Sequence, residues 1–186
     1  MNERCQKRDI LLWALRILLS AACVAMLAFI FSNSFKTGEK SAAQSSQVVD
    51  VVQQVAQAVA PQSPIATATG ADYEMLHTII RVIAHFSEFF VLGVSFMLCA
   101  YSYTQKTPWL FFPLGGVLLV PALDELVQLF VSGRGAEWTD FFTDAVGGAC
   151  GVVLALLAVV LVGYSYRILW KKRERARLGL EKGAEV

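Results

Sequence analysis

Residues 121–151 read PALDELVQLFVSGRGAEWTDFFTDAVGGACG, which is two apolar segments separated by a short polar turn. Five acid or amide side chains lie within these apolar segments: Asp124, Glu125, Gln128, Asp140 and Asp144. A charged residue near the centre of a membrane helix costs about 2.5–3.5 kcal/mol on insertion scales. A protein that keeps several carboxylates so close together in apolar segments is therefore expected to use them.

The whole chain is rich in apolar residues. Hydrophobic residues make up 56% of the 186, and the mean hydropathy is +0.54, whereas soluble domains are about 45–50% apolar. Apolar runs of about 20 residues, the length of a transmembrane helix, recur along the chain. They lie at 10–31, 79–103, 109–131 and 140–166. We therefore predict an all-α, polytopic membrane protein with four transmembrane helices in one domain, residues 1–186.

Residues 32–78, between the first two apolar runs, are predicted to form an outer loop that contains a short extracytoplasmic amphipathic helix. Valines recur at helical spacing over 48–59, with Gln and Asp on the other face. Ser41 or Ser45 would begin this helix, and Pro61 would end it. The helix either lies at the membrane interface or covers a site as a lid.

Polar residues of the predicted spans fall on shared faces and at similar depths. The second span, which Asp72 is expected to cap, carries four of them at spacings of four, four and three: His77, Arg81, His85 and Glu88. At a rise of 1.5 Å per residue, His85 lies roughly 9 Å, Asp124 roughly 10 Å and Asp144 roughly 6 Å below the outer ends of their spans. Arg134 lies in the turn above them. These residues predict an acid-rich cup with apolar walls.

The distribution of basic residues predicts the orientation in the membrane. Four lie before residue 17, Lys106 lies in the turn between the second and third spans, and seven lie in the tail at 167–186, which together make 12 of the 16 Lys and Arg. Basic residues are enriched in cytoplasmic segments. Both termini are therefore predicted to be cytoplasmic, and the cup is predicted to face outward. We interpret the basic tail as a topology anchor and expect no nucleic-acid partner.

Five short motifs carry a resemblance to a known family. They are F-S at 31–32, H-F-x-E-F-x-x-L-G at 85–93, D-E-x-x-Q-x-F at 124–130, G-R at 133–134 and D-x-x-x-D-x-x-G-x-x-x-G at 140–151. In this order and on these spans, the chain resembles the VanZ-like family of bacterial membrane proteins. It departs from the family pattern in its long loop at 32–72, and at Asp144, where the resemblance leads us to expect Asn in many relatives.

The resemblance implies a multi-pass protein of the bacterial plasma membrane. The name-giving member of the family is associated with low-level resistance to the glycopeptide antibiotic teicoplanin. Carried over residue by residue, the candidate functional positions, with binding or catalytic roles undecided, are His85, Glu88, Asp124, Glu125, Gln128, Arg134, Asp140 and Asp144. The resemblance identifies no cofactor and leaves open whether the protein is an enzyme.

Four interpretations of the cup stay open at this point. The first is a site, binding or enzymatic, for an amphiphilic envelope ligand such as a lipid-linked precursor or a lipoglycopeptide, with Arg134 pairing to its phosphate or carboxylate. The second is a divalent-metal site of a membrane enzyme, although the chain lacks the duplicated E-x-x-H of di-iron helical bundles. The third is a proton- or ion-coupled transporter, although the polar residues are confined to the outer half. The fourth is a network that only fixes helix packing.

Overall fold

The structure is a computed structural model. It describes residues 3–184, except for the side chains of residues 3–5, 107–108, 172 and 175–184. Its elements, in order, are α1 (Glu3–Ser34), α2 (Gly38–Val59), α3 (Ala71–Tyr103), the 3₁₀ helix η1 (Thr107–Phe111), α4 (Phe112–Gln128) and α5 (Trp138–Ala184). Over the described residues the regular elements are all helices, without a strand. The predicted all-α fold is confirmed.

Four of these helices are long and apolar enough to cross a membrane. The spans are Gln6–Ser34, Ala71–Tyr103, Trp109–Gln128 and Trp138–Lys171. They expose many large apolar side chains, among them Leu18, Leu119 and Leu161, each more than half exposed. A bilayer covers such side chains without cost, because lipid tails are as apolar as leucine. The prediction of a membrane protein with four apolar helices of spanning length is therefore confirmed.

Two helix starts differ from the sequence predictions. α2 begins at Gly38 rather than at Ser41 or Ser45, and Thr37 is its N-cap residue, with the side chain accepting a bond from the Lys40 N–H at 3.4 Å. α3 begins after Gly70, whose φ of 56° turns the chain, so Asp72 does not cap the helix. Asp72 instead lies in the first turn, where its negative charge interacts favourably with the helix dipole.

The helix ends follow local chemistry more closely. α2 ends at Val59, two residues before Pro61, as predicted, because a proline ring disfavours helical backbone in the residue before it. α4 ends at Gln128, three residues before the predicted end of the third span. α5 continues through the basic tail, whose Leu, Lys, Arg and Glu residues all favour helix.

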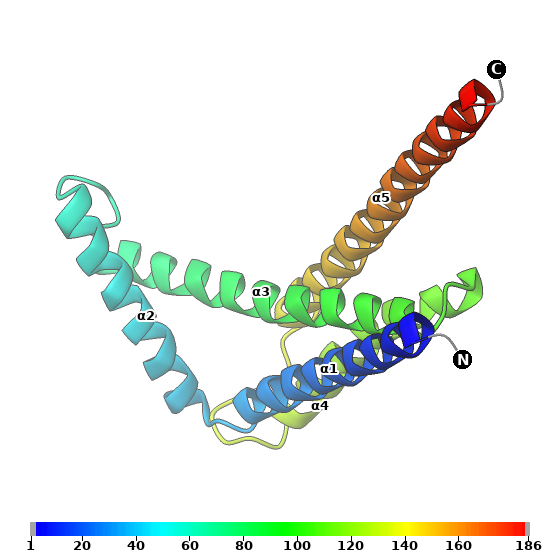
Figure 1. The fold of residues 1–186 in the computed structure, drawn as a ribbon. Helices are drawn as coiled ribbons and strands as arrows, with labels where there is room; N and C mark the ends of the chain where they lie inside the picture. The colour runs from blue at the N-terminus through cyan, green and yellow to red at the C-terminus, as the bar shows by residue number, and fades with distance from the viewer. Residues whose placement is uncertain (1–2, 185–186) are drawn as a thin grey trace.

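The helices pack most closely where α3 crosses α5 (Figure 1). Glycines make this possible: a Cβ on Gly93 would lie 2.1 Å from the Gly148 carbonyl oxygen, and a Cβ on Gly151 would lie 2.1 Å from the Phe90 carbonyl oxygen. Gly147 likewise faces the Phe86 backbone, so these small residues let the two helices approach closely.

α1 runs antiparallel to α3, with its first half beside the end of α3 (Figure 1). The Arg16 side chain donates to the Ser102 carbonyl at 2.9 Å, and Ser20 Oγ lies 3.2 Å from the Tyr103 hydroxyl. The last turns of α1, which carry the polar run at 32–34, therefore lie beside the middle of α3 rather than near its ends.

α2 and the first half of α3 are the two arms of a helical hairpin, joined by the loop at 60–70 (Figure 1). The Gln53 amide donates to the Ile65 and Ala68 carbonyls at 3.2 and 2.9 Å, which holds the connecting loop against α2. Tyr73 of α3 donates to Asp50 of α2 at 3.2 Å. At its other end, α2 is held by the Gly38 N–H, which donates to the Ser132 carbonyl at 3.1 Å.

Candidate functional site

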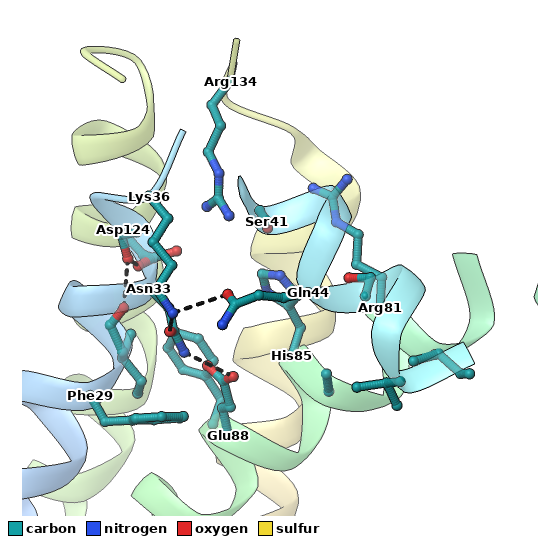
Figure 2. A pocket seen from close by; sticks show the side chains of 17 residues that line it. Phe29, Asn33, Lys36, Ser41, Gln44, Arg81, His85, Glu88, Asp124 and Arg134 are labelled. Atoms are coloured by element: carbon teal, nitrogen blue, oxygen red, sulfur yellow. Dashed lines mark hydrogen bonds between the residues drawn. The ribbon is translucent and has the colours of Figure 1, made fainter. Parts of the chain in front are cut away.

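A cavity of about 270 Å³ opens between the end of α1, the start of α2 and the middle of α3 (Figure 2). It has basic, acidic and apolar parts. Its polar lining is Asn33, Ser34, Lys36, Ser41, Gln44, Ser45, Arg81, His85, Glu88, Asp124 and Arg134. Its apolar lining is Phe29, Ile30, Val48, Ile80, Ala84 and Phe89. Such a lining suits a ligand that has both a polar and an apolar part.

Hydrogen bonds across the cavity join α1 to α2 and α3. Lys36 Nζ donates to Asn33 Oδ1 at 2.8 Å and to Gln44 Oε1 at 3.0 Å. Asn33 in turn donates to Glu88 Oε1 at 3.3 Å, and Figure 2 shows these bonds side by side. Lys36 is therefore held by neutral amides, and no acid among the described residues pairs with it.

Arg134 points into the cavity from the turn between α4 and α5 (Figure 2). Gly133 gives this turn its shape, with φ at 72°. Among the described residues, the Arg134 guanidinium has no hydrogen-bond or ion-pair partner. Burial and the nearby Arg81 lower its pKa from the ordinary value, although an arginine stays charged at neutral pH. The turn thus presents an unpaired cation to the cavity.

Arg81 differs from Arg134 because it already has a partner. Its Nη2 donates to Asp140 Oδ2 of α5 at 2.5 Å, and the two side chains are 39% and 11% exposed. This ion pair bridges α3 and α5 at the edge of the site. Asp140, predicted as a site residue, therefore neutralises a cation of the cavity wall.

Behind the cavity lies a buried layer of acids. Asp144 of α5 is fully buried, and its Oδ1 lies 3.2 Å from Nδ1 of His85, which lines the cavity. Asp124 of α4 is buried and accepts bonds from the Ser34 hydroxyl and, at 2.6 Å, from the Gln128 amide.

Glu125, next to Asp124 on α4, belongs to the same layer. Its Oε2 accepts the backbone N–H of Glu137 at 2.7 Å. One carboxylate oxygen each from Asp124, Glu125 and Asp144 lies within 4.8 Å of the others. The three acids therefore face one another.

The structure thus brings together the eight residues predicted from the sequence. Four of them line the cavity: His85, Glu88, Asp124 and Arg134. The other four lie next to the cavity: Glu125, Gln128, Asp140 and Asp144. Asp140, Asp144 and Gln128 bond to the lining residues Arg81, His85 and Asp124, and Glu125 bonds to the Glu137 N–H of the α4–α5 turn. Three of the four residues on the predicted polar face of α3, namely Arg81, His85 and Glu88, line the cavity. The fourth, His77, lies outside the lining, with its Nε2 3.3 Å from the Ala42 carbonyl oxygen of α2.

Sequence reasoning named no site residue at the end of α1 or in α2, although one interpretation of the loop helix placed it over a site. Asn33, Ser34 and Lys36 reach the site from the end of α1, and Ser41 and Gln44 from the first turns of α2. The signal that could have found them is the polar run that ends the first apolar segment, because Asn33 and Ser34 of this run bond to Glu88 and Asp124. The F-S motif at 31–32 and the lid interpretation of the loop helix pointed in that direction.

The comparison with protein families decides what kind of protein this is. The family model described as VanZ/LLP1 matches residues 19–161. The chain belongs to the VanZ/LLP1 family. No significant match was found among curated proteins or among solved structures.

In this VanZ/LLP1 protein the matched region runs from the middle of α1 into α5. It includes the cavity, the buried acids and the turn that carries Arg134. The resemblance drawn from the short motifs is therefore confirmed at the level of the family.

Proposed function

We propose that this VanZ/LLP1 protein binds the anionic head group of an amphiphilic cell-envelope molecule in the cavity between α1, α2 and α3. The observation that carries the proposal is the unpaired Arg134 guanidinium inside a half-apolar cavity. A guanidinium offers a planar fork of donors that binds phosphate or carboxylate through two parallel hydrogen bonds. An anion is therefore the partner that this cation lacks.

The charge balance of the cavity supports an anionic ligand. Arg81 is neutralised by Asp140, whereas Arg134 and Lys36 have no acid partner among the described residues. Lys36 is held only by amide oxygens, which a stronger acceptor such as a phosphate would displace. Two cations from different elements, the end of α1 and the α4–α5 turn, would thus converge on one head group.

The apolar wall supports a lipid-like tail on the same ligand. Phe29, Ile30 and Phe89 line one part of the cavity, and Val48 of α2 lines another. Along α2 the valines at 48, 51, 55 and 59 are at least half exposed, which suits a helix lying at a membrane interface. A lipid-linked envelope precursor or a lipoglycopeptide has both required parts.

The second candidate function is acid–base catalysis on this ligand. It is favoured by one observation, the bond between His85 Nδ1, on the cavity wall, and the buried Asp144. A carboxylate in this position fixes the imidazole orientation and supports its use as a general base or acid. Glu88, on the next turn of α3, would be a second proton carrier.

The location of the site completes the proposal. We place the protein in the bacterial plasma membrane, with both termini in the cytoplasm and the cavity toward the outer leaflet. The support is the excess of Lys and Arg near the termini and at Lys106. In this orientation the cavity meets ligands of the envelope, including teicoplanin, and the protein takes part in glycopeptide resistance.

The test compares Arg134→Gln with Lys40→Gln in a susceptible bacterium at matched membrane levels. Lys40 is an exposed cation on α2 outside the cavity lining, so it is the matched control. The measurements are the teicoplanin inhibitory concentration and teicoplanin binding to the purified protein in nanodiscs. Bonds to a charged group contribute about 1.5–3 kcal/mol. Arg134→Gln should therefore weaken binding about 10- to 150-fold and abolish protection, whereas Lys40→Gln should keep both.

Equal binding by wild type and Arg134→Gln would refute the head-group assignment. Protection without any measurable binding would point to a different envelope ligand, which mass spectrometry of co-purified lipids would identify by its loss from Arg134→Gln. Transport of protons or ions is the competing function. A flux into liposomes that disappears in Asp144→Asn would support transport in place of ligand binding.

A further inference from the structure

The acids behind the cavity form a compact oxygen cluster of their own. Asp124 and Glu125 come from α4 and Asp144 from α5, and one oxygen of each lies within 4.8 Å of the others. Their residues are 3%, 7% and 0% exposed, respectively. Three carboxylates are thus brought together with little exposure to solvent.

Each of the three carboxylates is held in place by a neighbour. Glu125 Oε2 accepts the Glu137 N–H at 2.7 Å, and Asp144 Oδ1 lies 3.2 Å from His85 Nδ1. Asp124 is bonded by the Ser34 hydroxyl and the Gln128 amide. Outer partners of this kind orient ligating carboxylates in metal sites and tune their affinity.

Two oxygens of the cluster have no partner. Glu125 Oε1 and Asp144 Oδ2 are buried, and neither has a hydrogen-bond partner among the described residues. Both belong to side chains more than nine-tenths buried. A buried acceptor without a partner costs free energy, and an ionised one costs more. Something that the protein itself does not supply must therefore satisfy these oxygens.

The local charges indicate a cation. Among the described residues, His85 hydrogen-bonds to Asp144 and to no other acid of the cluster, and Arg81 forms its ion pair with Asp140. The guanidinium of Arg134 forms no ion pair with any acid of the cluster. Three adjacent carboxylates therefore lack enough basic partners, and in a low-dielectric setting they repel one another strongly.

We propose that Asp124, Glu125 and Asp144 bind one hard divalent cation of the Mg²⁺, Mn²⁺ or Ca²⁺ class. An all-oxygen ligand set selects these ions over softer metals. Ligand oxygens lie about 2.0–2.1 Å from Mg²⁺ and 2.3–2.6 Å from Ca²⁺, so opposite ligands are about 4.0–5.2 Å apart. The three oxygens all lie within 4.8 Å of one another, so one ion of this class can reach all of them. The inference rests on the acid cluster alone and does not depend on the head-group assignment.

The test uses Mn²⁺ as the probe, because Mn²⁺ binds such ligands and is counted directly by electron paramagnetic resonance. The full-length protein in nanodiscs would be stripped with a chelator, titrated with Mn²⁺ and then challenged with Mg²⁺ or Ca²⁺. One Mn²⁺ per chain, displaced by either ion, is the expected result. Glu125→Gln and Asp144→Asn should each weaken binding by at least about tenfold.

The matched control is Glu137→Gln. Glu137 contacts the cluster through its backbone N–H but is itself exposed, and the substitution keeps the N–H that holds Glu125. It should bind Mn²⁺ like the wild type. A second readout guards against misfolding: Mg²⁺ should raise the melting temperature of wild type and Glu137→Gln but not of Glu125→Gln.

Two results would overturn the proposal. One is the absence of stoichiometric Mn²⁺ at about 1 mM, the weak end of the range for extracellular Ca²⁺ sites. The other is binding that persists unchanged in both Glu125→Gln and Asp144→Asn. Either result would mean that the three acids are satisfied by protons or water instead.

Discussion

Replacing Gly151 by alanine tests the close crossing of α3 and α5 that positions the site. The added Cβ would lie 2.1 Å from the Phe90 carbonyl oxygen and 3.0 Å from the Val94 nitrogen. Both neighbours are helix backbone, which cannot rotate away as a side chain can. The two helices must therefore separate locally to accept a single methyl group.

The expected cost follows from the size of this overlap. Forcing an extra methyl group into a closely packed interior costs about 1–3 kcal/mol. That corresponds to an unfolding equilibrium shifted about 5- to 150-fold. Alanine is more favourable than glycine in a helix by about 0.8–1.0 kcal/mol in a soluble host. The measured loss of stability would therefore be the cost of the overlap minus this gain.

Gly163→Ala is the matched control, because Gly163 lies on the same helix and no atom lies within 4 Å of an added Cβ. The assay is reversible unfolding in mixed detergent and dodecyl sulfate micelles, followed by helix content. Gly151→Ala should be destabilised by the amount above, and Gly163→Ala should be unchanged or slightly stabilised. Equal stability of the two variants would refute the close backbone contact at Gly151.

Two further substitutions test how the site is held together. Gly38→Ala would place a Cβ 2.0 Å from the Gly133 carbonyl oxygen, so α2 should move away from the α4–α5 turn. In a cysteine-free background with Ser45→Cys, the introduced thiol should then react several-fold faster with a water-soluble maleimide. Gly135→Ala, whose Cβ meets no described atom within 4 Å, is the control and should not change the rate. The second test concerns the ion pair between Arg81 and Asp140 at 2.5 Å: Arg81→Gln should destabilise the protein by about 1–3 kcal/mol, because it leaves Asp140 without its partner. Adding Asp140→Asn should recover part of this loss. Strictly additive effects in this double-mutant cycle would contradict the pairing.

The parts of the site that could be predicted from the sequence are those fixed by local periodicity. Arg81, His85 and Glu88 recur at helical spacing, so their shared face follows as soon as the segment is helical. The rise of a helix gave Asp124 and Asp144 similar predicted depths, and the structure brings their carboxylates together. The family resemblance rested on the same local motifs and is confirmed by the match over residues 19–161.

The parts that could not be predicted depend on contacts between distant segments. Thr37 caps α2 locally, but the start of α2 is also held by the bond from the Gly38 N–H to the Ser132 carbonyl, about 90 residues away in sequence, which no local pattern reveals. The role of Asn33 likewise depends on α1 ending beside Glu88. The unpaired oxygens of Glu125 and Asp144 are visible only once every potential donor around them has a position.

Asp124 links the two proposals, because it both lines the cavity and belongs to the acid cluster. A divalent cation on the cluster would place positive charge beside the cavity, on the same side as Arg134, and would favour an anionic head group there. The head group would in turn favour the cation, since coupling between two binding sites is reciprocal. The carboxylates that are costly to keep inside a membrane would then contribute to ligand binding through the ion they hold, and not by contacting the ligand themselves.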